Sequence, residues 1–210
     1  MVILRKKFFI FFSCVLFLAA TAVPSFAKGE ALAAVRTGVE ELLAILKDQA
    51  LRQPEKKTER HNAILQYICG QFDFAKMSEL VVTGTQWDRQ SEAERLRFTD
   101  LFSRLLEHAY VGKLENYTDE KVEFIRERMQ GDRGIVYTTI IHQGQSIPLN
   151  YTVYKKNETW LVYDVNIEGV SLVRNYRTQF QPILRKEGFN GLLEKMKEKI
   201  VALEKENRSQ

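Results

Sequence analysis

The chain has 210 residues, with 31 Lys and Arg against 27 Asp and Glu. Three of the basic residues and none of the acidic ones precede Lys28, so the remainder is close to neutral and no nucleic-acid partner is expected. Of the two cysteines only Cys69 follows Lys28, which excludes an internal disulfide there. Its apolar neighbours Leu65 and Ile68 predict a buried thiol.

The first 27 residues have the pattern of a cleavable signal peptide. Arg5, Lys6 and Lys7 form a positive segment, residues 8–20 are apolar, and Ser25 and Ala27 place small residues where a signal peptidase reads. The alternative is a membrane anchor, but the apolar run is shorter than the ~20 residues that a spanning helix needs. We therefore expect an exported protein whose mature chain, residues 28–210, forms a single domain.

The N-terminal half of the mature chain is predicted to be helical. Apolar residues recur at helical spacing over residues 28–49, 56–70 and 72–82, with a break near Pro54. Ser91 and Glu94 form a capping box that opens a longer helix, which reaches about residue 116. The wide aromatic face of this helix is consistent either with ordinary core or with the wall of an apolar cavity.

From Glu120 the apolar period changes to two, which is typical of strands. Four strands are expected over about residues 121–129, 135–141, 147–153 and 160–167, and the short turns between them predict an antiparallel meander. The expected fold class is α+β, with this four-stranded sheet packed against a set of helices and an apolar pocket between them.

The fourth strand is predicted to run through Glu168 and Gly169 into a helix of residues 170–184, with Ser171 as a cap or first-turn residue. We expect this helix to fold back onto the sheet, because only there would its apolar stripe be buried. Gly188 is expected to end it, before a last helix.

Residues that carry catalysis or bind metals are sparse. His61, His108 and His142 fall in separate predicted elements and have no second ligand at metal-binding spacing, so no metal site and no cofactor are predicted. Asp73 and Asp164 lie among apolar residues. Each is either a carboxylate with a raised pKa or, more simply, a helix cap or a solvent-facing or paired residue.

Two blocks of spaced residues carry a resemblance to a known family. One contains Tyr163-Asp164-Val165, residues 167–173, Asn175-Tyr176-Arg177 and Gln179-Phe180. The other contains Phe72-Asp73-Phe74, Met77, Gly84, Trp87, Phe98, Phe102, Leu105-Leu106, Tyr110, Leu114 and Tyr117. In this order they resemble the MlaC-type periplasmic phospholipid-binding proteins, also called the toluene-tolerance family.

The resemblance implies a periplasmic phospholipid carrier rather than an enzyme, with lipid as cargo and no cofactor. It implies exchange with an inner-membrane ABC transporter that has a lipid-binding periplasmic subunit, and with an outer-membrane lipoprotein complex. We also expect a monomer. The candidate lipid-binding residues lie on the apolar faces of the long helix, the strands and the helix that follows them: Phe102, Leu106, Tyr110, Leu114, Val136, Ile140, Leu149, Tyr151, Val153, Tyr163, Val165, Ile167, Val173, Tyr176 and Phe180.

Two other functions stay open on the sequence alone. One is a small α+β-fold enzyme acting on an apolar substrate, with Asp73, Asp164 or a tyrosine as its acid or base. The other is a periplasmic interaction protein that binds no ligand, in which the apolar faces are only core.

Overall fold

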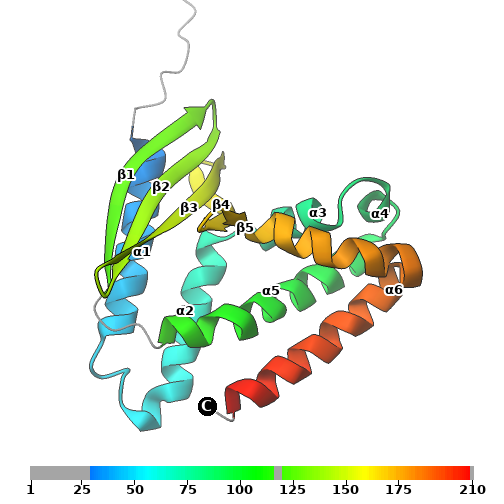
Figure 1. Ribbon diagram of the computed structural model, residues 1–210, viewed down its shortest axis with the longest axis horizontal. Coiled ribbons are helices and arrows are strands. Elements are labelled where there is room, and N and C mark those ends of the chain that lie inside the picture. Colours follow the sequence, from blue (N-terminus) through cyan, green and yellow to red (C-terminus); the bar gives the residue numbers. More distant parts are fainter. Residues whose placement is uncertain (1–28, 116–119, 209–210) are drawn as a thin grey trace, which may run out of the picture.

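A computed structural model describes residues 29–115 and 120–208, and these form the predicted α+β fold (Figure 1). The predicted signal peptide lies outside the described residues. In chain order the elements are α1 (Glu30–Lys47), a 3₁₀ turn (Pro54–Lys56), α2 (Lys57–Gln71), α3 (Phe74–Val82), α4 (Gly84–Asp88), α5 (Glu92–Glu115), β1 (Lys121–Gln130), β2 (Arg133–His142), β3 (Gln145–Lys156), β4 (Thr159–Ile167), β5 (Val170–Ser171) and α6 (Leu172–Arg208).

The sheet is an antiparallel meander in the order β1-β2-β3-β4-β5, so the prediction of four strands missed one. Val170 and Ser171, expected in the helix, pair instead with Ile167 and Asn166 of β4. The turn between them, Glu168-Gly169, has φ values of 50° and 87°. Two successive left-handed residues match the twist of the flanking strands and close such a hairpin.

A bulge in β4 decides which side chains face which side of the sheet. Thr152 of β3 pairs with Asp164, whereas the next residue, Val153, pairs with Val162, so Tyr163 has no partner. One inserted residue reverses the alternation of faces. Val162 and Val165 therefore belong to the same apolar cluster, while Tyr163 packs against a different one.

The start of α6 is bound to the sheet through Asp164. The Val173 N–H donates to Asp164 Oδ1 at 3.0 Å, and the Ser171 hydroxyl donates to Oδ2 at 2.5 Å. The Arg174 N–H in turn donates to Ser171 Oγ at 3.0 Å. Ser171 is thus the cap that the sequence predicted. Asp164 is a paired residue, as in the simpler of the two interpretations of its sequence, and not an isolated carboxylate. The predicted capping box at Ser91 and Glu94 is confirmed as well.

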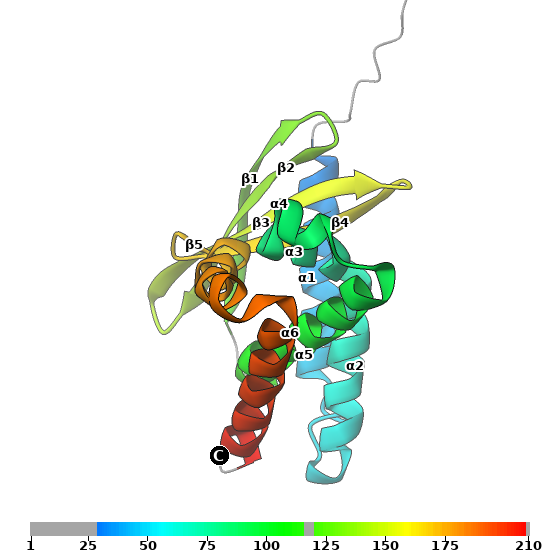
Figure 2. The same ribbon diagram turned by 90° about the vertical axis from the view of Figure 1, so that its right-hand side faces the viewer.

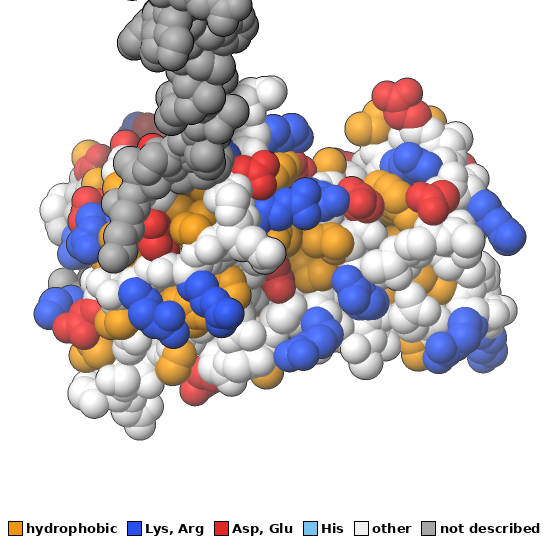
Figure 3. Space-filling model, turned by 90° about the horizontal axis from the view of Figure 1, so that it is seen from above, with side chains coloured by type: hydrophobic (Ala, Val, Ile, Leu, Met, Phe, Trp, Pro, Cys, Tyr) orange, Lys and Arg blue, Asp and Glu red, His pale blue; other side chains and the backbone are white. Residues whose placement is uncertain are grey.

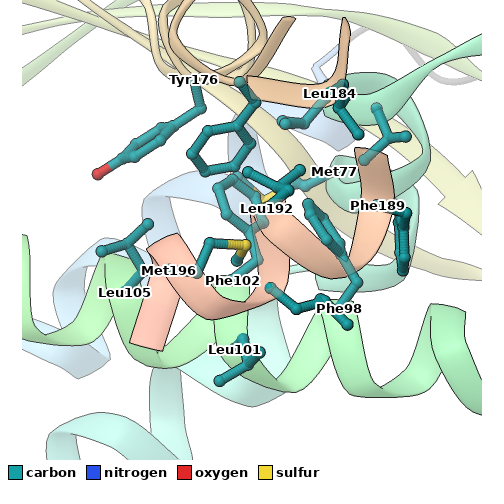
Figure 4. Packing of buried hydrophobic residues seen from close by; sticks show 14 of the residues in the cluster. Met77, Phe98, Leu101, Phe102, Leu105, Tyr176, Leu184, Phe189, Leu192 and Met196 are labelled. Atoms are coloured by element: carbon teal, nitrogen blue, oxygen red, sulfur yellow. The ribbon is translucent and has the colours of Figure 1, made fainter. Parts of the chain in front are cut away.

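The apolar stripe of α6 packs mainly against α3 and α5, not against the sheet as we expected. Where these three helices meet, their buried side chains form a cluster rich in aromatic rings, which we call the aromatic cluster (Figure 4). In it, Tyr176 lies edge-on to Phe102, with 5.3 Å between the ring centroids. At Gly188, with φ 71°, α6 breaks, and its second half folds back along α5 (Figure 2). The physical reason is that α5 presents aromatic side chains to α6: Phe180 packs edge-on against both Phe98 and Phe102.

The other apolar residues lie between the sheet and the first two helices. α1 runs across one face of the sheet, and α2 packs beside α1 and against α5 (Figure 1). The N-terminus of α1 is fixed by Glu127 of β1, whose carboxylate accepts hydrogen bonds from the N–H groups of Gly29 and Leu32. A carboxylate at this position satisfies unpaired N–H groups and favours the positive end of the helix dipole.

We predict that Glu127→Ala lowers the free energy of unfolding by about 1–2 kcal/mol, the usual cost of removing a helix cap. The measurement is urea unfolding of both proteins. Glu123→Ala is the control, because it removes a carboxylate of the same strand that pairs with the exposed Lys121 instead of capping a helix. It should change stability by less than about 0.5 kcal/mol. Equal effects of the two substitutions would show that α1 does not depend on this cap.

Candidate functional site, an apolar cavity

A cavity of about 410 Å³ lies between β3, β4 and the helices α1, α2 and α5. Most of its wall is apolar. The lining residues are Ala34, Val35, Gly38, Val39, Leu42, Leu65, Tyr67, Ile68, Cys69, Gln71, Phe72, Phe74, Met77, Ser103, Leu106, Glu107, Tyr110, Val111, Leu114, Leu149, Tyr151, Val153, Trp160, Val162, Val165, Ile167 and Leu172. A pocket of this size and character suits an apolar ligand.

Eight of the predicted lipid-binding residues line this cavity. They come from α5, β3 and β4 and are Leu106, Tyr110, Leu114, Leu149, Tyr151, Val153, Val165 and Ile167. The three from β3 follow the strict alternation of a regular strand, so their shared face was correctly inferred.

The other seven predicted residues do not line the cavity. Phe102, Val173, Tyr176 and Phe180 belong to the cluster between α3, α5 and α6, because α6 packs there. Tyr163 faces that cluster as a result of the bulge. Val136 is fully buried with α1, and Ile140 lies farther along β2. Tyr176 is nevertheless close behind the wall, since its hydroxyl hydrogen-bonds that of Tyr110.

The residues predicted to bind lipid did not include the part of the wall that α1 and α2 supply. The α1 contribution includes Val35, Val39 and Leu42, which the helical spacing had already placed on one stripe. That stripe was the available signal, but spacing does not say whether an apolar face meets core or cavity. Trp160 and Val162 were missed because the bulge shifts the alternation in β4.

Polar groups of the wall are few and desolvated. Burial raises the pKa of the Tyr151 phenol, for which the described residues provide no hydrogen-bond partner. Burial first, and then Tyr110, raises the pKa of Tyr176. Cys69 lines the cavity but is exposed, so the prediction of a buried thiol was wrong: its side of α2 faces an opening rather than core.

Asp73 is buried and belongs to a polar junction between α3 and the sheet. Its carboxylate accepts hydrogen bonds from the Lys76 N–H at 2.8 Å, from Lys156 Nζ at 3.0 Å and from the Tyr154 hydroxyl. Burial alone would raise the pKa of Asp73, but Tyr154, the Lys76 N–H and Lys156 outweigh it and lower the pKa. The raised pKa that would suit an acid catalyst is therefore contradicted, and Asp73 is a helix cap.

A depressed pKa in the folded state means that Asp73 stabilises the fold above the ordinary aspartate pKa of about 4, and that this stability is lost as the pH falls through the folded value. We predict that Asp73→Asn lowers the free energy of unfolding by about 1–2 kcal/mol near neutral pH and reduces the further loss on acidification. Urea unfolding at about pH 6 and about pH 3 measures both effects. Asp88→Asn, at an exposed position, is the control, and an equal acid response of the two variants would contradict the prediction.

Two absences hold within residues 29–115 and 120–208. No group of three or more His, Cys, Asp and Glu side chains comes together in a way that could hold a metal ion. No helix in these ranges is both long and apolar enough to cross a membrane. On the face seen in Figure 3, basic and acidic side chains are interspersed with apolar ones.

Comparison with known proteins points to one family. A family model described as MlaC protein matches residues 36–198. A curated relative from Haemophilus influenzae, the intermembrane phospholipid transport system binding protein MlaC, is 27% identical over 143 residues, which are 65% of this chain and 64% of the relative. The chain thus spans less than two thirds of that relative's length.

A solved structure is similar as well. It is that of the phospholipid-binding protein from Ralstonia solanacearum in complex with a phospholipid. The sequences are 30% identical, the TM-score is 0.73, and the alignment covers 82% of this chain and 98% of the other.

Proposed function

The chain belongs to the MlaC protein family, as the sequence resemblance predicted, and from this premise we propose that it binds phospholipid in the cavity and carries it between membranes. One observation carries the proposal: an apolar cavity of about 410 Å³ in a fold shared with a protein solved in complex with phospholipid. The curated relative is a binding protein of a transport system, not an enzyme.

The energetics of acyl chains explain why a carrier needs such a cavity. Each methylene group costs roughly 0.8 kcal/mol to expose to water, so a chain of about 16 carbons costs on the order of 12 kcal/mol. A cavity walled by Leu106, Val153 and Val165 removes most of that cost. The bilayer is equally apolar, so transfer between bilayer and cavity is close to neutral, and direction has to come from other components.

The partners are those that the family resemblance implies. We propose an inner-membrane ABC transporter with its lipid-binding periplasmic subunit on one side, and an outer-membrane lipoprotein complex on the other. The name of the curated relative, which refers to an intermembrane transport system, supports this. ATP would be used by the transporter, so this chain needs no nucleotide site or other cofactor, and a monomer is sufficient for carriage.

Carriage between two membranes requires export to the periplasm. We predict that the mature protein begins at Lys28, because Ser25 and Ala27 complete the signal-peptide pattern. N-terminal sequencing of the protein purified from the periplasmic fraction measures this. An intact Met1 in a membrane fraction would contradict it.

The direct test of the function is native mass spectrometry of the purified full chain. We predict that the protein retains phospholipid, since dissociation would expose acyl chains to water. Extraction and identification of the lipid would complete the measurement. A protein that is folded but always empty would favour the ligand-free interaction protein, and turnover of a lipid ester would favour the enzyme.

A charge in the wall provides a sharper test. We predict that Val165→Glu remains folded but purifies without phospholipid, because a carboxylate in the lipid-filled cavity is costly, while water can enter an emptied one. The measurement is thermal unfolding and extracted lipid on the same sample. Val170→Glu makes the same change at an exposed position and should retain lipid. If Val165→Glu keeps its full lipid content, Val165 does not contact the cargo.

A further inference from the structure

The cavity wall carries a single charged side chain. Among its lining residues, all of them in the described part of the chain, Glu107 is the one Asp, Glu, Lys, Arg or His. The other polar groups are neutral hydroxyls, a thiol, an amide and an indole N–H, on Tyr67, Cys69, Gln71, Ser103, Tyr110, Tyr151 and Trp160. The wall therefore offers a carboxylate and no cation.

Glu107 is positioned rather than loosely solvated. His61 Nε2 of α2 donates to Glu107 Oε1 at 3.1 Å, and the Glu107 side chain is 20% exposed. The second oxygen, Oε2, makes no hydrogen bond or ion pair with another described residue. A carboxylate in which one oxygen is hydrogen-bonded and the other is not can accept further hydrogen bonds from a ligand.

The field of this carboxylate reaches the cavity opening. Cys69, which is exposed and lines the cavity, has a pKa raised by burial and, next, by the charge of Glu107. Ser103 and Tyr110, on the same face of α5, also line the wall beside it. The polar side of the cavity is thus the seam between α2 and α5, and its charge is negative.

A phospholipid head group would meet this charge in a predictable way. A carboxylate repels a phosphate and attracts a cation, and its hydrogen bonds with ionised donors are the strong ones. A primary ammonium supplies three N–H donors, as a lysine side chain does. A quaternary ammonium has the same charge but no N–H, and a glycerol head group leaves the phosphate charge uncompensated.

We propose that Glu107 gives the cavity a preference for phospholipids whose head group ends in a primary ammonium, such as phosphatidylethanolamine. This rests on the proposed function, since it assumes that phospholipid is the cargo. The cargo's acyl chains contact the apolar wall, and its ammonium donates to Glu107 Oε2 at the seam between α2 and α5. Glu107 is then a specificity-determining residue, and His61 orients it.

The test is loading from mixed vesicles. The full chain is delipidated and incubated with vesicles that contain equal amounts of phosphatidylethanolamine, phosphatidylcholine and phosphatidylglycerol, at a pH at which an ordinary imidazole is neutral. The bound lipid is then extracted and quantified. The wild-type protein should hold phosphatidylethanolamine in about three-fold excess over either competitor, the size expected of one partly exposed ion pair.

Three variants test whether the lipid preference depends on the charge at position 107 or only on correct folding. Glu107→Gln should hold the same total lipid but lose the preference, and Glu107→Lys should shift it toward phosphatidylglycerol. Glu204→Gln is the matched control, because Glu204 pairs with His108 of α5 at 3.3 Å but does not line the cavity. It should keep the wild-type preference.

Each result bears on a different claim. Lipid-loaded wild-type protein without an excess of phosphatidylethanolamine would overturn the role of Glu107 and leave the carrier function standing. An excess that persists in both Glu107 variants would do the same. A wild-type protein that takes up no lipid would overturn the proposed function, and this inference with it.

Discussion

The aromatic cluster between α3, α5 and α6 is the interaction on which the hollow half of the molecule depends. The apolar side chains that line an unfilled cavity lack packing partners on one side, so they lose dispersion contacts that the same side chains would make in a core. The whole stability of a domain is typically about 5–15 kcal/mol. A fold that keeps such a cavity therefore needs a densely packed region elsewhere, and Phe98, Phe102, Phe180 and Phe189 provide one.

The separation into a densely packed region and a hollow region also explains why hydrogen bonds hold the start of α6 in place. Asp164 accepts from the Val173 N–H, and Arg177 of the same helix donates to the Leu80 carbonyl of α3 at 2.8 Å. The bond from Arg177 fixes α6 to α3 on the solid side, and the bond to Asp164 fixes it to β4, which also supplies part of the cavity wall. α6 contributes only Leu172 to the cavity wall among the described residues, so most of its apolar side chains serve the aromatic cluster instead.

Apart from the short elements α4 and β5, the sequence was sufficient for the helices and strands and for the order of the four long strands, but it was insufficient for the faces. The capping box at Ser91 and the helical stripe of α1 are local signals, so they were correctly interpreted. The bulge at Tyr163 depends on how β4 pairs with β3, which no local pattern encodes. The direction of α6 depends on tertiary contacts with α3 and α5, which the periodicity of its own sequence does not encode.

For the same reason about half of the predicted lipid-binding residues line the cavity, and most of the rest lie in or against the core. An apolar face has the same composition whether it meets another side chain or an acyl chain, since both provide the same dispersion contacts. What distinguishes the two is the presence of isolated polar groups that have no reason to be in a core. Tyr151, without a hydrogen-bond partner among the described residues, and Glu107, with one open oxygen, are of this kind. A core tends to exclude such groups, whereas a cavity that alternately holds lipid and water tolerates them. The polar exceptions, more than the apolar majority, therefore support the proposal that this wall binds a ligand.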